Sequence, residues 1–135
     1  MSNKETLVEL WSRVDNFGEL DAIDEFLTPE FVRHGGKGDQ TREDFKRILA
    51  GLHAGFPDLQ SEIADVVAEG DRVAYRWVST GTHLGVYLGA PPTGRKVVAS
   101  GITISRFENG KVVEDWASWN EVSVLHSLGV LPIDR

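Results

Sequence analysis

An alternation of apolar and polar residues runs through RVAYRWVSTGTH, residues 72–83. A period of two is typical of a β-strand, because successive side chains point to opposite faces of a sheet. Three further segments show the same period, at residues 59–68, 96–107 and 111–119. The turn sequences Glu69-Gly70-Asp71 and Glu108-Asn109-Gly110 connect these segments in pairs. The second half of the chain is therefore predicted to form two antiparallel hairpins.

The first half of the chain has the helical period instead. Leu7, Leu10 and Val14 share one face of an amphipathic helix. A second helix is predicted over residues 19–27, ending before Pro29, because proline cannot continue a helix. A third helix is predicted from Thr41 to about residue 56, with Thr41 and Asp44 at the spacing of a capping box. Shorter elements are expected at residues 31–34 (a strand), 35–39 (a glycine loop), 84–95 (a loop rich in Gly and Pro) and 120–128 (a helix).

Helices followed by an antiparallel sheet predict an α+β fold, in which the helices cover one face of a strongly curved sheet. The 135 residues fit one domain, residues 1–135. The strands carry apolar residues on both faces, for example Trp77 on one face and Val78 on the other. Since the helices cover one face only, we expect the other to be covered by a second copy in a homodimer. The alternative is a deeper core within a monomer.

Composition argues against several classes of protein. The 14 Lys and Arg against 21 Asp and Glu give a net charge of −7, so nucleic acid is not an expected partner. The absence of cysteine excludes disulfides, thiolate metal sites and a cysteine nucleophile. No apolar stretch approaches the roughly 18 residues of a membrane span, and the N-terminal segment lacks the apolar core of a signal peptide. We therefore expect a cytoplasmic protein that binds no membrane.

The chemistry must come from scattered residues, because the sequence contains no GxSxG, HExxH or GxGxxG motif. Its four histidines lack metal-ligand spacing, so no metal is expected. His34 and His83 each end an extended segment before a glycine-rich loop. Such ends often form the mouths of pockets, so each histidine is a candidate general base. The alternative for both is a structural histidine.

The last extended segment carries a second group of candidates. Glu114, Trp116 and Asn120 share one face by the period of two. If Trp116 faces the helices, Glu114 lies in an apolar pocket, where a raised pKa would suit proton transfer. Asn120 cannot move a proton by itself, but its amide can bind a substrate oxygen. Its alternative role is the N-cap of the following helix.

Several sequence stretches together resemble one known family. They are Phe56-Pro57-Asp58-Leu59, Gly81-Thr82-His83, Pro92-Thr93-Gly94-Arg95, residues 110–114 with Trp116, and residues 125–129. This combination is similar to the SnoaL-like polyketide cyclase family. The resemblance implies a cone-shaped, curved antiparallel sheet wrapped around N-terminal helices, which is the cystatin-like barrel of the nuclear-transport-factor-like superfamily. It also implies a dimer, and aldol chemistry on polyketide esters without metal or organic cofactor.

The resemblance also implies a catalytic Asp four residues after the tryptophan of the last strand, where this chain has Asn120. We therefore expect His83, His34 or Glu114 to carry proton transfer. Substrate binding is expected from Asn120, Trp116, Trp77, Tyr75 and Phe56. The expected function is that of a cofactor-independent enzyme acting on a hydrophobic carbonyl compound, most like a polyketide ester cyclase or an isomerase. The alternatives are a non-catalytic small-molecule binding module, an epoxide hydrolase or a dehydratase.

Overall fold

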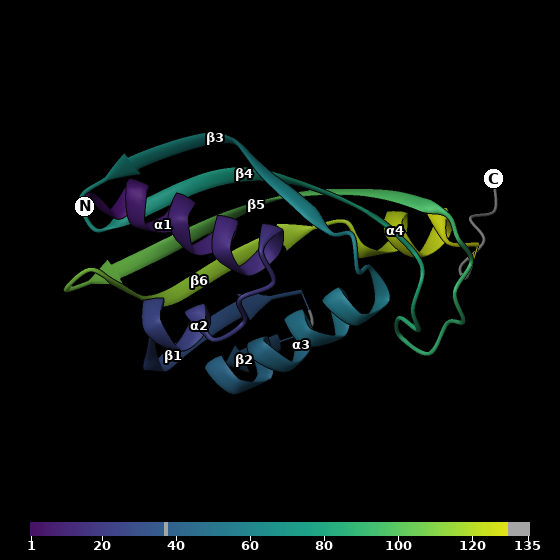
Figure 1. Cartoon of the computed structure of the whole chain (residues 1–135). Helices are drawn as coiled ribbons and strands as arrows, with labels where there is room; N and C mark the ends of the chain where they lie inside the picture. The colour runs from purple at the N-terminus through teal and green to yellow at the C-terminus, as the bar shows by residue number, and fades with distance from the viewer. Residues whose placement is uncertain (37, 130–135) are drawn as a thin grey trace.

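The computed structural model describes residues 1–36 and 38–129 of the chain (Figure 1). Its helices are α1 (Asn3–Trp11), the π-helical turn η1 (Ser12–Asn16), α2 (Ala22–Phe26), α3 (Arg42–Gly55) and α4 (Glu121–Ser127). Its strands are β1 (Leu27–Gly35), β2 (Gly38–Thr41), β3 (Gln60–Glu69), β4 (Arg72–Thr82), β5 (Lys96–Glu108) and β6 (Lys111–Trp119). The expected α+β class is confirmed.

The six strands form one curved sheet in the order β2-β1-β6-β5-β4-β3 (Figure 1). All neighbours pair antiparallel except β1 and β6, which run parallel. The two edge strands, β2 and β3, have no pairing with each other among the described residues. The sheet is therefore an open, curved layer and not a closed barrel.

The elements with strong local signals form where the sequence predicts them. The two hairpins, β3–β4 and β5–β6, are confirmed. The capping box at the start of α3 is also confirmed, because Asp44 N donates to Thr41 Oγ1 and Thr41 N donates to an oxygen of Asp44. The second helix is shorter than expected, since β1 already begins at Leu27. The expected loop at 35–39 is also wrong in part, because β2 begins at Gly38.

The main core lies between the helices and the inner face of the sheet. Helix α1 packs against β3 and β4, while α3 packs against β1 (Figure 1). The side chains that fill this layer are buried and mostly aliphatic or aromatic, and include Leu7, Leu10, Val14, Ile23, Phe31, Phe45 and Val73. A second apolar cluster, Phe56, Leu59, Val97, Val124 and Leu128, joins the end of α3 to β5 and α4. The helices therefore leave the outer face of the sheet uncovered.

The face of strand β6 that points toward the helices carries Asp115 and Trp119, and not Glu114 and Trp116. Asp115 is only 2% exposed, and Trp119 lines the space between sheet and helices. Trp116 lies on the outer face, where its ring stacks on His34 at 5.6 Å between centroids. The expectation that Glu114 and Trp116 face the helices is therefore wrong. Because β6 has a tryptophan on each face, its hydrophobic pattern does not distinguish inside from outside.

Candidate functional site

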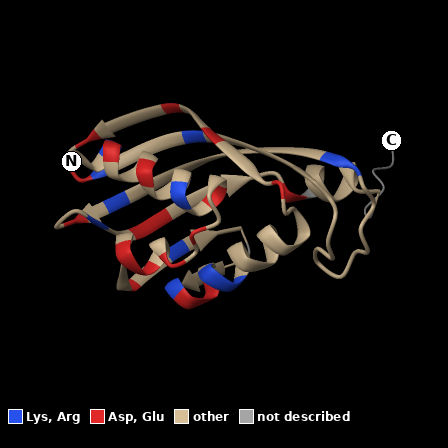
Figure 2. Cartoon of the chain, in the orientation of Figure 1, with Lys and Arg blue, Asp and Glu red and all other residues tan. Residues whose placement is uncertain are grey.

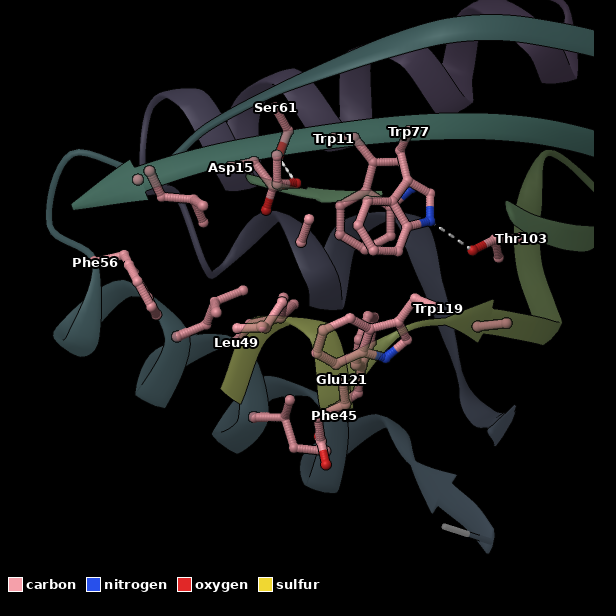
Figure 3. A pocket seen from close by; sticks show the side chains of 18 of the residues that line it. Trp11, Asp15, Phe45, Leu49, Phe56, Ser61, Trp77, Thr103, Trp119 and Glu121 are labelled. Carbon is pink, nitrogen blue, oxygen red and sulfur yellow. Dashed lines mark hydrogen bonds between the residues drawn. The ribbon is translucent and has the colours of Figure 1, made fainter. Parts of the chain in front are cut away.

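A cavity of about 1060 Å³ lies between the inner face of the sheet and helices α1 and α3 (Figure 3). Its volume is slightly above the range of about 300–1,000 Å³ that is usual for small-molecule pockets. Aromatic side chains from several elements form much of its wall, namely Trp11, Phe45, Phe56, Tyr75, Trp77, Tyr87 and Trp119. The cavity can therefore hold a large, flat, apolar molecule.

Two of the three indole groups in the wall, those of Trp11 and Trp77, present apolar ring faces because their N–H groups are already bonded. Trp77 Nε1 donates to Thr103 Oγ1 at 3.1 Å, as Figure 3 shows. Trp11 Nε1 donates to Tyr75 Oη at 3.0 Å. A ring whose polar edge is satisfied within the wall is free to stack on an apolar ligand.

A glycine on β5 allows two of these tryptophans to meet. The rings of Trp77 and Trp119 lie 6.3 Å apart between centroids, on either side of Gly101. A Cβ atom added to Gly101 would lie 2.4 Å from Cζ2 of Trp77 and 2.7 Å from Cβ of Trp119. This wall of the cavity therefore requires the missing side chain at position 101.

Gly101→Ala is expected to lower the free energy of unfolding by about 1–3 kcal/mol, because the added methyl group overpacks the wall. Chemical denaturation followed by circular dichroism measures the change. Gly51→Ala is the matched control, since a Cβ atom at this position of α3 would meet nothing within 4 Å. That control should be neutral or slightly stabilising, because Ala has the higher helix propensity. Equal stability of both variants would contradict the tight-wall interpretation.

Asp15 is the carboxyl group that stands out in the cavity wall. It belongs to the π-helical turn η1, in which Phe17 N donates to Ser12 O at 3.2 Å. Its side chain is 14% exposed and points into the cavity (Figure 3). Its Oδ1 atom has no hydrogen-bond partner within residues 1–36 and 38–129. Burial raises the pKa of Asp15 to about 6, against a smaller lowering by a hydrogen bond from Ser61 and by the charge of Arg33.

Ser61 of β3 places a hydroxyl group opposite Asp15. Its backbone is held by Asn16, whose Oδ1 accepts from Ser61 N at 2.7 Å and whose Nδ2 donates to Ser61 O at 3.1 Å. Its hydroxyl lies 2.6 Å from that of Ser79. Either hydroxyl can be the donor in this pair. Asn16 therefore anchors η1 to β3, and this holds Asp15 beside Ser61.

A buried polar cluster lies behind the wall. Asp115 Oδ1 accepts a hydrogen bond from Ser105 Oγ at 2.6 Å, and its other oxygen lies 3.8 Å from Nη1 of Arg33. The guanidinium of Arg33 also lies over the ring of Phe45, 4.5 Å from its centroid. Burial raises the pKa of Asp115 to about 6. Asp115 does not line the cavity, whereas Arg33 does, so this carboxyl group supports the wall from outside the site.

Four of the residues expected to bind substrate line the cavity: Phe56, Tyr75, Trp77 and Asn120. Asn120 is also the N-cap of α4, with its Oδ1 accepting from Ser123 N at 3.0 Å. The alternative role of Asn120 is thus confirmed, and its Nδ2 group is the part left to donate toward the cavity. Trp116, the fifth, lies on the outer face of the sheet and does not line the cavity.

The candidates for proton transfer do not meet in the cavity. His34 lies on the outer face, with Nε2 2.6 Å from Glu114 Oε2 and Nδ1 2.8 Å from Asp39 Oδ1. These hydrogen bonds raise the pKa of His34, that to Glu114 most. The bond to His34 lowers the pKa of Glu114, so the expected raised pKa is wrong. His34 and Glu114 stabilise each other's charged forms, which an apolar pocket would not do.

His83 is fully buried just behind the cavity wall. Its Nδ1 atom lies 3.0 Å from Thr93 Oγ1, and its ring packs against Phe56 at 5.5 Å between centroids. Phe56 lines the cavity and His83 does not. The catalytic role expected for His83 therefore stays a prediction. It requires that the substrate or a proton reach His83 past the ring of Phe56.

The described part of the chain holds no group of three or more His, Asp or Glu side chains placed to bind a metal ion. None of its helices is long and apolar enough to cross a membrane. Figure 2 shows Lys and Arg interspersed with Asp and Glu over the strands and helices, whereas residues 83–94 carry neither sign. Tyr87 and its neighbours bring this uncharged loop to the cavity.

Comparison with known proteins gives consistent matches. The family model for SnoaL-like polyketide cyclases matches residues 5–128. AclR of Streptomyces galilaeus, a proposed hydroxylase, shares 33% identity at a TM-score of 0.89, over 98% of this chain and 88% of that one. IdmH of Streptomyces antibioticus, a proposed polyketide cyclase, shares 30% identity at a TM-score of 0.83, over 96% of this chain and 100% of that one. No curated protein matches the sequence.

Proposed function

The chain belongs to the SnoaL-like polyketide cyclase family, and we propose that it is a cofactor-independent enzyme that transfers protons on a hydrophobic carbonyl compound. AclR and IdmH are similarly related to it but are assigned different reactions, so the reaction must be argued from the site. The observation that carries the proposal is Asp15, a carboxyl group with an unpartnered oxygen in a large aromatic cavity. A purely structural cavity does not need such a group.

Asp15 suits the proton transfers of an intramolecular aldol condensation. Its ionised carboxylate takes a proton from a carbon next to a carbonyl group of the substrate. The resulting enolate carbon attacks a second carbonyl carbon of the same molecule, which forms the new C–C bond. The proton on Asp15 is then returned to the oxygen of the attacked carbonyl. A pKa of about 6 suits a base that must both accept and release a proton near neutral pH.

The walls of the cavity favour a flat, multi-ring substrate. Trp77 and Trp119 offer ring faces from the sheet, and Phe56 closes the end near α3 (Figure 3). The amide Nδ2 of Asn120 can donate to a substrate oxygen, since its Oδ1 is occupied by the cap of α4. If the cavity instead catalyses an isomerisation, Asp15 would return the proton to a different carbon of the substrate and not to an oxygen. Product analysis separates these reactions.

A ligand screen tests the proposal. Polyketides, steroids, terpenoid ketones and epoxides are added to the protein, and its thermal unfolding is measured. A ligand at about 100 times its Kd is expected to add roughly 2.7 kcal/mol of stability. Each stabilising compound is then incubated with the protein and analysed for a cyclised or isomerised product. Stabilisation without any product would favour a non-catalytic binding module, and hydrolysis of an epoxide would favour an epoxide hydrolase.

The uncovered outer face of the sheet supports the homodimer that the sequence predicts. Val67, Val98 and Ile102 are more than half exposed on this face. It also carries both signs of charge, for example the pair of Arg76 and Asp65 at 2.7 Å. A face with apolar and mixed charged residues can be self-complementary, as a two-fold dimer requires. We therefore propose that a second copy of the chain covers it.

Ile102→Arg is expected to weaken this dimer by more than about tenfold in Kd, because it places an unpaired charge in an apolar contact. Sedimentation equilibrium measures the dissociation constant. Leu84→Arg is the matched control, since Leu84 is an equally exposed apolar residue in the loop after β4 and does not belong to the outer face. A monomeric wild-type protein, or equal dissociation constants for both variants, would contradict the proposal.

A further inference from the structure

Two buried, unpartnered polar atoms face each other at the edge of the cavity. Oδ1 of Asp15 and Nε2 of His53 lie 3.9 Å apart. Both belong to the four buried side-chain atoms in the described part of the chain that have no hydrogen-bond partner. Such atoms are rare in folded proteins, and each of them calls for an explanation. That two of them are neighbours points to a shared function.

The two side chains occupy different positions relative to the cavity. Asp15 lines it, whereas His53, in the last turn of α3, does not. The imidazole is 19% exposed, and its Nε2 atom reaches to within 3.9 Å of Asp15 without lining the cavity itself. A ligand in the cavity would therefore meet Asp15 and not His53.

His53 faces Asp15 through Nε2. This atom has no hydrogen-bond partner in the described part of the chain, and it meets Oδ1 of Asp15 as an acceptor when the proton of the neutral ring is on Nδ1. Burial lowers the pKa of His53 and so favours the neutral ring. In this tautomer Nε2 carries a lone pair and no hydrogen. A lone pair thus points at a carboxylate oxygen.

One proton shared between Asp15 and His53 would remove the repulsion between these two groups. With no proton, the Nε2 lone pair and an ionised Asp15 repel each other. When Asp15 is protonated on Oδ1, its O–H group can donate to Nε2 after the atoms approach by about 1 Å, which brings them to hydrogen-bond distance. The other groups that face the pair are the positive charge of Arg33 on β1 and the hydroxyl of Ser61 on β3. Neither can accept the proton, since Arg33 is always charged and a serine hydroxyl is too weak a base.

We propose that Asp15 and His53 form a dyad that holds one proton, in which His53 is a positioning residue for Asp15. This rests on the proposed function only in that Asp15 is the group that touches the substrate. During the reaction the C–H bond of the substrate breaks and its proton goes to Asp15. The new O–H group then donates to Nε2 of His53, while the electron pair of the broken bond remains in the enolate. The dyad keeps the proton until it is returned to the product oxygen.

Nitrogen NMR of protein with ¹⁵N-labelled histidine tests the dyad without any substrate. In the wild type, the Nε2 resonance of His53 is expected to shift in one step with the protonation of Asp15, near pH 6. In Asp15→Asn this step should be lost, because the carboxyl group that supplies it is gone. The exposed His126 is the internal control, and its nitrogen resonances should be the same in both proteins at each pH. A His53 titration that is the same in both proteins would overturn the proposal.

A second variant tests the positioning role of His53 through the pH profile of turnover. His53→Gln places an amide N–H, which can donate to the ionised carboxylate, where the wild type has only an acceptor. The acid limb of kcat against pH is expected to move down by roughly one pH unit. An unmoved limb would overturn the positioning role. If the NMR step is present but Asp15→Asn keeps full turnover, the dyad stands and the proposed function fails. If the NMR step is absent but Asp15→Asn loses turnover, the proposed function stands and the dyad fails.

Discussion

Asp15→Asn is expected to reduce the turnover of a carbonyl substrate by about 10²- to 10⁴-fold, which is the usual contribution of a general acid–base group. The amide has nearly the shape of the carboxyl group but cannot accept a proton from carbon. Binding of the same ligand should be preserved, because the aromatic walls of the cavity are unchanged. The measurements are steady-state kinetics for kcat and a fluorescence titration of the tryptophans for Kd.

Asp115→Asn is the matched control for this experiment. Asp115 is buried and has a pKa raised to about 6, like Asp15, but it lies behind the wall and not in the cavity. A general effect of removing a buried negative charge would therefore appear in both variants. We expect the large loss of kcat in Asp15→Asn alone. Full turnover in Asp15→Asn would contradict the role of Asp15 in proton transfer.

The same Asp15→Asn variant is expected to be more stable than the wild type at pH 8. The pKa of Asp15 is about 6 in the folded chain against an ordinary value of 3.8, so the folded state binds the proton more tightly than the unfolded state. Ionisation therefore costs stability, and the cost grows as the pH rises from about 4 to about 6. At 1.36 kcal/mol per pKa unit, the full cost above pH 6 is on the order of 3 kcal/mol. The uncharged amide of the variant removes this cost.

Chemical denaturation at pH 4 and at pH 8 measures this difference. At pH 4, where the folded wild type carries a protonated Asp15, the two proteins should have nearly equal free energies of unfolding. At pH 8 the variant should be the more stable one. A variant that is less stable than the wild type at both values would show that ionised Asp15 is not a strained group. The comparison with the wild type cancels the other groups that titrate in this range, such as His34.

Together, the two results would identify Asp15 as a group that is kept at a cost to stability. A residue that serves packing loses stability when it is replaced, whereas a catalytic residue in an apolar cavity commonly gains it. The opposite signs for turnover and stability are thus a sharper test of a functional site than either measurement alone.

The hairpins, α3 and the class of fold could be predicted from sequence because their signals are local. Asn109 and Gly110 both have positive φ, of 52° and 79°, which the tight turn between β5 and β6 requires and these residue types tolerate. Alternation also placed Tyr75 and Trp77 on one face of β4, and the structure confirms both in the cavity wall. Each of these features depends on residues a few positions apart.

No local sequence pattern predicts the parallel pairing of β1 with β6. None predicts which face of β6 points toward the helices either. His34 lies opposite Trp116 in that pairing, although the two residues are far apart in the chain. This pairing sends Glu114 to the outer face, where His34 and Arg106 hold its carboxylate. The two prominent candidates from sequence thus became each other's partners, away from the cavity. When both faces of a strand carry apolar residues, either face can point toward the helices. Only the packing of the whole sheet decides which one does.

The sequence by itself determined the order of the main helices and hairpins and the aromatic character of the cavity, because periodicity, caps and turns act over short distances along the chain. Only the tertiary structure decided which titratable groups meet there. Helical spacing leaves Asp15 on the polar flank of the first helix, and the π-helical turn of η1 directs it into the cavity. Its neighbours Ser61 and His53 come from β3 and α3. Burial and proton affinity depend on such distant contacts, which a local pattern does not encode.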